Sequence, residues 1–200
     1  RMGVYFLETG ANQRPSKVIY DRDYSSIALA DASVFNWSEI FKNADWFHIT
    51  GITPAISKIT AENSLCAVKT AKSLGVKVSC DLNYRSKLWN YGVTAPEIMR
   101  EIIQYVDLCI ANEEDIQKSL DIKVDGFSED GLINQEKYMQ LAAKLLNAFP
   151  NIELVAISLR ESSNANQNDW SACLYDKTQF IRSKKYAISD IVDRVGGGDS

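Results

Sequence analysis

The sequence lacks two features typical of nucleic-acid and membrane proteins, an excess of positive charge and a long hydrophobic run. It has 22 Lys and Arg residues against 26 Asp and Glu residues, for a formal net charge of -4 at pH 7. Without a basic stripe, general affinity for nucleic acid is not expected. No apolar run approaches the roughly 20 residues needed to span a bilayer, and no signal peptide is recognisable. We therefore expect a cytoplasmic protein whose partners include neither nucleic acid nor membrane.

Histidine and paired cysteines are also scarce, which limits the chemistry. His48 is the only histidine, so a Ser/His/Asp or Cys/His mechanism would have to use it. Because His48 lies in an apolar run, we expect a hydrogen-bonded structural role. No CxxC pair is present, so no zinc site is predicted. Buried, reduced thiols are expected for Cys66, Cys80, Cys109 and Cys173.

Most of the chain alternates strand-like and helix-like segments. Strands are predicted at 46–49, 76–80, 106–110 and 152–159. Helices are predicted at 37–41, 60–74, 96–105, 113–120 and 134–148. The strands are apolar on both faces, as a buried parallel sheet requires. The expected fold is α/β, a doubly wound, mostly parallel sheet with helices on both faces.

Residues 1–24 differ from the α/β core predicted over residues 25–200. They contain two short strands, 4–7 and 17–20, separated by a polar connection. A two-stranded ribbon is marginal alone, so it must pair with other strands or with a partner. At the other end of the chain, we expect a polar loop over 160–169. An antiparallel pair, 170–175 with 180–186, should follow this loop.

Two polar stretches follow predicted strands, where ligands bind in open α/β sheets. The first is Asp81–Arg85, whose arginine could bind a carboxylate or phosphate with two parallel hydrogen bonds. A capping aspartate and a solvated arginine are the structural alternative. The second is Asn112–Asp115, with three successive acids that suit Mg²⁺ held through water. A helix cap with acids at its positive end explains the second stretch equally well.

Three consecutive glycines, Gly196, Gly197 and Gly198, precede Asp199 at the end of the chain. Without Cβ atoms, this backbone can approach a ligand closely, and successive N–H groups form a concave anion site. The acid beside that anion could accept a proton. A loose glycine turn is the alternative. No Lys-Ser/Thr pair follows, so the stretch is not a Walker A loop.

Together these motifs resemble those of the ribokinase-like sugar kinases of the phosphofructokinase-B type. The resemblance covers essentially all 200 residues, and its most specific motif is the last. The matching motifs, in order, are Asp81-x-Asn83-x-Arg85, Asn112-x-x-Asp115 and Asp193-x-x-Gly196-x-Gly198-Asp199. Within the family, the chain most resembles the kinases of 2-keto-3-deoxygluconate, a sugar acid. That closer likeness lies in residues 5–8, 13–22, 51–55, 81–85 and 169–171. The resemblance also implies a fragment, with pieces missing before Arg1 and after Ser200.

The resemblance implies phosphoryl transfer from ATP, with Mg²⁺ as cofactor. Asp199 would be the general base that takes a proton from a sugar hydroxyl. Gly196, Gly197 and Gly198 would form the anion hole for the transferred phosphoryl group. Such transfer depends on positioning and charge stabilisation. Asn112 and Asp115 match the family's Asn-x-x-Glu motif, which helps to place Mg²⁺ and phosphates, although the fourth position here is Asp rather than Glu.

The resemblance also implies a sugar-acid substrate, whose carboxylate needs a cation. The positions that would hold it are Tyr5, Tyr20, Arg22 and Arg85, with Tyr5 matched less closely than the others. The ribbon of residues 1–24 resembles the family's lid, which closes over the substrate and excludes water. Its exposed edge favours pairing with a second subunit, so a homo-oligomer through the lid is predicted.

Three alternatives remain open from the sequence. One is a ribokinase-like kinase for another sugar, such as fructose, ribose or a nucleoside. Another is a non-catalytic protein that binds a sugar acid. The third is an α/β binding domain that merely contains a glycine-rich turn.

Overall fold

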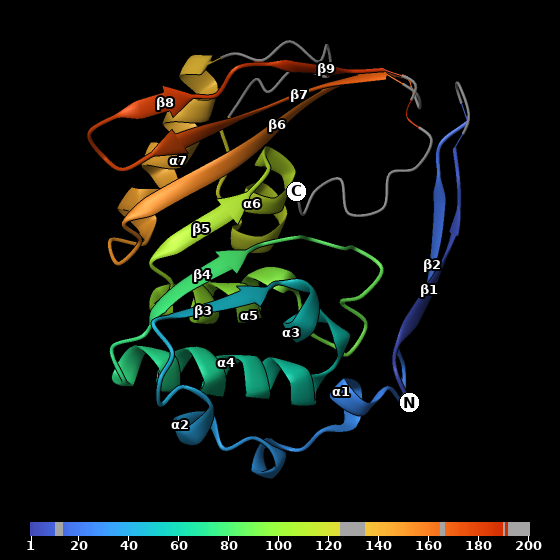
Figure 1. The fold of residues 1–200 in the computed structure, drawn as a ribbon, viewed down its shortest axis with the longest axis vertical. Helices are drawn as coiled ribbons and strands as arrows, with labels where there is room; N and C mark the ends of the chain where they lie inside the picture. The colour runs from blue at the N-terminus through green and yellow to red at the C-terminus, as the bar shows by residue number, and fades with distance from the viewer. Residues whose placement is uncertain (11–13, 125–134, 165–166, 190, 192–200) are drawn as a thin grey trace.

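The computed structural model describes residues 1–10, 14–124, 135–164, 167–189 and 191 (Figure 1). Two short strands near the N-terminus form a separate ribbon. They are β1 (Val4–Glu8) and β2 (Lys17–Asp21), paired antiparallel with Tyr5 opposite Tyr20. The ribbon stands beside the larger sheet (Figure 1). Both predicted strands of residues 1–24 are therefore confirmed.

The larger sheet has a parallel centre and an antiparallel side. The parallel strands are β3 (Trp46–Thr50), β4 (Lys77–Asp81), β5 (Leu108–Ala111) and β6 (Leu154–Asn164). The antiparallel strands are β7 (Gln167–Tyr175), which pairs with β6, and then β8 (Phe180–Arg182) and β9 (Tyr186–Ile188), which both pair with β7. In Figure 1, strands β3, β4 and β5 point towards the side where the ribbon stands. The predicted α/β class and the parallel strands are confirmed.

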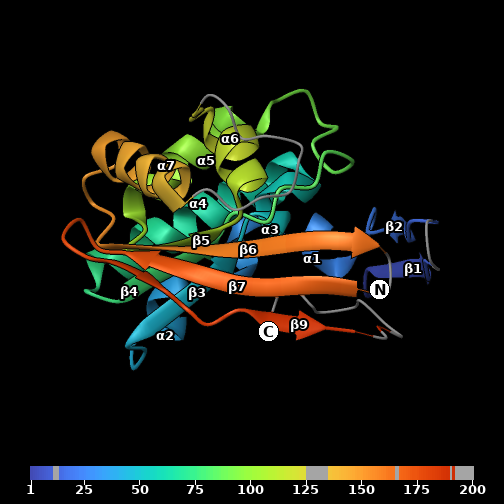
Figure 2. The same cartoon turned by 90° about the horizontal axis from the view of Figure 1, so that it is seen from above.

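Four longer helices cover one face of this sheet (Figure 2). They are α4 (Lys58–Ser73), α5 (Ala95–Ile102), α6 (Glu113–Leu120) and α7 (Gln135–Ala148). The shorter helical segments are α1 (Ser26–Leu29), α2 (Trp37–Ile40), α3 (Ile52–Ile56), η1 (Ala32–Val34) and η2 (Ile103–Tyr105). No helix in the described ranges is long and apolar enough to cross a bilayer.

The core lies between the sheet and this helical layer. Val78, Cys109 and Ile157 point into it and are fully buried. Helices were expected on both faces, and within the described ranges the longer ones gather on one. On the opposite face, Trp46 is exposed and Ala156 is half-buried.

The predicted polar loop at 160–169 is wrong, because β6 and β7 run through most of it as a long hairpin. Arg160 lies opposite Trp170, and Glu161 lies opposite Asp169. The side chain of Lys185 binds both acids of the second pair, at 2.8 Å and 2.7 Å. Backbone pairing and the shared Lys185 ammonium stabilise these strands, although their polar side chains do not show the pattern that predicts a strand. Of the antiparallel strands predicted after the loop, 170–175 is present within β7, whereas 180–186 is divided into β8 and β9, which each pair with β7.

The histidine and the cysteines were predicted to be structural. His48 is hydrogen-bonded as expected, with Nδ1 2.8 Å from the hydroxyl oxygen of Ser79. Cys80, Cys109 and Cys173 are buried thiols, whereas the prediction for Cys66 is wrong because it is exposed on α4. Burial raises the pKa of each of the three buried thiols, to about 11 for Cys173. These three groups are therefore held in the unreactive thiol form.

Candidate functional site

The end of β4 brings the backbone of three strands together. Gly51, just after β3, donates its N–H to the carbonyl oxygen of Asp81 at 2.7 Å. Leu82 donates its N–H to the carbonyl oxygen of Ile110 on β5 at 2.9 Å. At Asn83 the backbone turns with φ of +37°, in the left-handed region that asparagine tolerates better than most residues. The strand therefore ends sharply, and the next residues leave the sheet.

Asn83 is buried at this turn with only part of its amide satisfied. Its Nδ2 donates to the Asp81 carboxylate at 3.1 Å. Its amide oxygen is buried and has no hydrogen-bond partner in the described part of the chain. A buried acceptor of this kind is costly, and such groups concentrate at functional sites. The turn thus presents a carboxylate and an amide oxygen at the carboxyl end of the sheet.

The start of α6 is fixed by a reciprocal cap. Asp115 donates its backbone N–H to the side-chain oxygen of Asn112 at 2.7 Å. In return, the Asp115 carboxylate accepts the backbone N–H of Asn112 at 3.4 Å. This capping box satisfies orphan N–H groups of the first turn. Both residues are thereby held at the carboxyl end of β5.

A single carboxylate joins these two stretches. Asp115 Oδ1 accepts the backbone N–H of Tyr84 at 2.9 Å, and Asp115 is only 6% exposed. Burial raises the pKa of Asp115 to about 6, although the two backbone amides lower it. The strand-end rule had predicted both stretches as site candidates, and the structure places them in contact. The hydrogen bond itself could not be predicted from the side-chain pattern, because its donor is a backbone amide.

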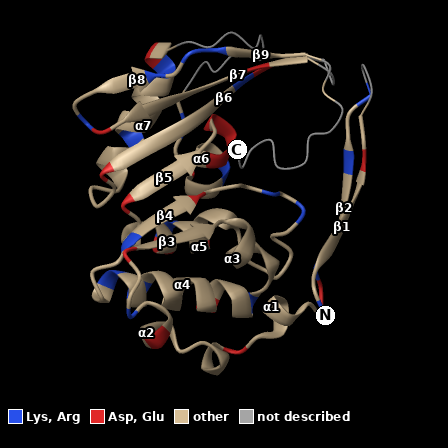
Figure 3. Cartoon of the chain, in the orientation of Figure 1, with Lys and Arg blue, Asp and Glu red and all other residues tan. Residues whose placement is uncertain are grey.

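The predicted substrate residues form two groups. Arg85 is exposed, and its guanidinium donates to the carbonyl oxygen of Tyr84 at 2.8 Å. On the ribbon, Tyr5 and Tyr20 are cross-strand neighbours, and the Arg22 guanidinium lies 4.8 Å from the centre of the Tyr20 ring. Figure 3 shows positive residues on the loop after β4 and acidic ones at α6.

The two groups are connected by a residue that the sequence analysis missed. Lys87, on the loop after Arg85, donates its ammonium to the carbonyl oxygen of Val18 on β2 at 3.4 Å. Its acceptor is a backbone group, so no side-chain pattern could have indicated the contact. The ribbon therefore touches the loop that carries Arg85.

The proposed phosphoryl-transfer motif cannot be placed in the same way. Gly196, Gly197, Gly198 and Asp199 lie outside the described residues. Their roles stay predictions.

The described donors suit a Mg²⁺ ion held through water. Asp81 and Asp115 supply carboxylate oxygens, and Asn83 supplies the buried amide oxygen without a described partner. Hard oxygen ligands of these kinds match the preference of Mg²⁺, which usually keeps several waters. Among the described residues, no group of three or more His, Cys, Asp or Glu side chains could hold a metal directly. The residues present fit water-mediated binding rather than an all-protein cage.

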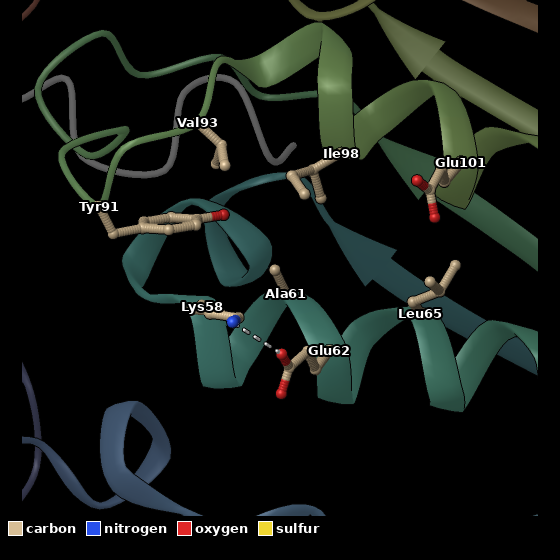
Figure 4. Close-up of a pocket in the computed structure, with 8 residues that line it drawn as sticks. All are labelled: Lys58, Ala61, Glu62, Leu65, Tyr91, Val93, Ile98 and Glu101. Carbon is tan, nitrogen blue, oxygen red and sulfur yellow. Dashed lines mark ion pairs between the residues drawn. The ribbon is translucent and has the colours of Figure 1, made fainter.

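A pocket of about 410 Å³ lies elsewhere, between α4 and α5 (Figure 4). Its lining is mainly apolar, and an ion pair between Lys58 and Glu62 lies at its rim. The Tyr91 hydroxyl donates to the carbonyl oxygen of Pro54 at 2.6 Å, and burial raises the pKa of Tyr91 to about 12. The pocket includes none of the predicted site residues, so it is separate from the strand-end site.

The fold and the strand-end site define a class, that of α/β proteins with a polar site at the carboxyl ends of parallel strands. The sequence profile of the pfkB family carbohydrate kinases matches residues 1–200. The chain therefore belongs to the pfkB family of carbohydrate kinases.

Individual relatives agree with this assignment. The 2-dehydro-3-deoxygalactonokinase of Haloferax volcanii is 30% identical over all 200 residues, which span 55% of that protein. The crystal structure of 2-dehydro-3-deoxygluconokinase from Thermotoga maritima is 45% identical with a TM-score of 0.89. A pfkB family carbohydrate kinase from Listeria grayi is 32% identical with a TM-score of 0.81. The alignment with each structure covers 100% of this chain and 58% of the other, so the chain spans little more than half the length of these relatives.

Proposed function

We propose that the protein transfers the terminal phosphoryl group of ATP to the 6-hydroxyl of 2-keto-3-deoxygluconate. The observation that carries the proposal is the 45% identity, with a TM-score of 0.89, to the Thermotoga maritima kinase. That kinase is named for the same sugar acid, which is also called 2-dehydro-3-deoxygluconate. The Haloferax volcanii relative is named for the galactonate epimer, so 2-keto-3-deoxygalactonate is the second candidate substrate.

The chemistry assigned to the C-terminal motif follows from phosphoryl transfer. Asp199 accepts the proton of the sugar hydroxyl as that oxygen attacks the terminal phosphorus of ATP. The backbone N–H groups of Gly196, Gly197 and Gly198 stabilise the charge that develops on the transferred group. Mg²⁺, when bound, offsets charge on the phosphates, and Asn112 and Asp115 help to place it through water.

The sugar acid is assigned to the space between the loop after β4 and the ribbon. Arg85 and Arg22 supply fixed, permanently charged donors for its carboxylate. Tyr5 and Tyr20 supply hydroxyls for its polar groups. The ribbon would contact this loop when the ribbon covers the substrate. The hydrogen bond from Lys87 to the Val18 carbonyl oxygen supports this arrangement. Covering the site would exclude water and limit wasteful hydrolysis of ATP.

The ribbon is also the proposed contact with a second copy of the chain. On one of its faces, Val4, Phe6 and Ile19 are 40%, 62% and 54% exposed, and Phe6 lies opposite Ile19. An exposed apolar face on a short sheet favours association. The predicted cytoplasmic location remains a prediction.

The decisive assay offers both sugar acids and a panel of neutral sugars to a protein that contains the whole chain. ATP- and Mg²⁺-dependent product should form fastest with 2-keto-3-deoxygluconate or its galactonate epimer. Preference for fructose, ribose or a nucleoside would instead identify another sugar kinase. Binding of a sugar acid without any phosphorylated product would favour the non-catalytic alternative.

Asp199→Asn tests the general base. Loss of the base should lower kcat by about 100- to 10,000-fold, because general base catalysis contributes about that much. Affinity for the sugar acid, measured by calorimetry, should stay within about twofold because the substitution keeps size and shape. Turnover that survives the substitution would contradict the assignment of Asp199.

A further inference from the structure

Asp115 is more than a helix cap, because its carboxylate also holds a segment from another strand. One oxygen accepts the Tyr84 N–H at 2.9 Å, across 31 positions in the sequence. The other accepts the Asn112 N–H at 3.4 Å. An ordinary capping box needs only the second contact. The first contact therefore calls for a separate explanation.

The Tyr84 backbone passes this constraint on to Arg85. The Tyr84 N–H is bound by Asp115, and the Tyr84 carbonyl oxygen accepts the Arg85 guanidinium at 2.8 Å. Arg85 is exposed, so little packing fixes its side chain. The position of the Arg85 guanidinium is therefore set largely by its hydrogen bond to the Tyr84 carbonyl oxygen.

Backbone hydrogen bonds flank this segment on both sides, and on its far side the Arg85 carbonyl oxygen accepts the Leu88 N–H at 3.0 Å. Leu82 is held by Ile110, but the next residue, Asn83, sits at a left-handed φ with a buried amide oxygen that lacks a partner in the described ranges. Such a conformation persists only where the surroundings hold it. The Asp115–Tyr84 hydrogen bond follows directly after this turn. It is thus placed to keep the turn from relaxing.

We infer that Asp115 is a positioning residue that acts through Tyr84 to place Arg85 for the substrate carboxylate. It thereby couples the sugar-acid side of the site to the nucleotide side, which begins at Asn112. The inference rests on the proposed function, since it takes Arg85 to bind the sugar acid. It gives Asp115 a role separate from any water-mediated contact with Mg²⁺.

Asp115→Asn tests the inference with little change in size. An amide presents one acceptor and one donor group, so it cannot accept both backbone N–H groups on different oxygens. The KM for the sugar acid should rise about tenfold, as expected for loss of one hydrogen bond to a charged group. Asp121→Asn is the matched control. Asp121 is exposed at the other end of α6, so the same change of Asp to Asn there should leave both KM values within about twofold.

A double-mutant cycle shows whether Asp115 acts through Arg85. If it does, Asp115→Asn should raise the KM for the sugar acid in the unsubstituted background but not in the Arg85→Ala background. Additive effects would overturn the inference. A rise in the KM for ATP alone would also overturn it, because that result would confine Asp115 to the nucleotide side.

Amide hydrogen exchange provides a readout that does not depend on turnover. In Asp115→Asn, the Tyr84 amide should exchange about ten times faster, while amides in the core of α6 keep their protection. Unchanged exchange at Tyr84 would overturn the inference. If the unsubstituted protein phosphorylates no sugar acid, the proposed function fails, and exchange at Tyr84 still decides whether Asp115 holds this segment.

Discussion

At the end of β3, Gly51 lies directly against the backbone of Leu82. Its φ of −63° is available to any residue, so glycine is not needed there for its backbone freedom. It is needed for space, because a Cβ atom would overlap the Leu82 carbonyl oxygen and come within 3.3 Å of the Met99 side chain. The position of Leu82, within the site segment Asp81–Arg85, therefore depends on the absence of a side chain at Gly51.

Gly51→Ala should both destabilise the protein and disturb the site. Overpacking of this kind costs about 1–3 kcal/mol, and the simplest relief moves Leu82 and the loop behind it. We expect a lower free energy of unfolding in urea and weaker binding of the sugar acid.

Gly75→Ala is the matched control. Gly75 follows α4 with φ of +76° and open space around it, so alanine costs about 1–2 kcal/mol by conformation alone. Sugar-acid binding should be unchanged in this variant. If Gly51→Ala loses stability but binds normally, the close contact with Leu82 does not position the site.

At the scale of the elements, Asp107 holds the amino ends of the parallel strands together, at the end of the sheet opposite the candidate site. It lies just before β5. This buried carboxylate binds the ammonium groups of Lys72 on α4 and Lys77 on β4, and it accepts the Val78 N–H at 2.8 Å. Burial alone would raise the pKa of Asp107, but these hydrogen bonds outweigh it and hold the pKa below its usual value. Asp107 therefore joins one helix and two strands in its ionised form.

Asp107→Asn should lower the free energy of unfolding at pH 7 by about 1–3 kcal/mol. Because the folded pKa lies below the unfolded pKa of about 4, the stabilisation is complete above that pH. It is lost as the pH falls through the folded value. Urea unfolding should thus show a difference in the free energy of unfolding between the variant and the unsubstituted protein, and this difference should become smaller in acid. Glu153→Gln, which removes the exposed second partner of Lys77, should have a much smaller effect. A difference of constant size would contradict this account of Asp107.

The elements differ in how well the sequence predicts them. The helix Glu113–Leu120 was predicted with its exact bounds, because Asn112 caps it and buried residues such as Ile116 and Leu120 recur on one face. The strand segments 160–164 and 167–169 were not predicted, because their strand character comes from pairing between β6 and β7. Strand propensity depends on such neighbours more than on the residues themselves. The short helix α3 was also missed, since Pro54 falls within its five residues.

The candidate site was likewise predicted only in part from the sequence. The strand-end rule predicted that Asp81–Arg85 and Asn112–Asp115 lie at one edge of the sheet. It could not predict the bond between Asp115 and Tyr84, or the contact of Lys87 with Val18, because each uses a backbone group. Side-chain patterns carry no information on which amide or carbonyl faces a given residue.

At the scale of the whole molecule, the ribbon β1–β2 forms a sheet of its own, and four of the five residues of β1 are exposed. Its proposed contact with a second copy is tested by Phe6→Ser, which removes the most exposed apolar side chain of the face formed with Val4 and Ile19. Sedimentation should shift from a concentration-dependent oligomer towards the monomer. Val34→Ser removes a similarly exposed side chain from η1 and should leave sedimentation unchanged. A protein that is monomeric before substitution would refute a ribbon interface.

The distribution of the four cysteines has a practical consequence for such measurements. Cys66 is exposed on α4, while Cys80, Cys109 and Cys173 are buried with raised pKa values. A maleimide reagent at neutral pH should therefore modify one position in the folded protein. That position accepts a fluorescent or spin probe without any change to the sequence. A second probe introduced on the ribbon would then report the distance between the ribbon and α4, with and without the sugar acid.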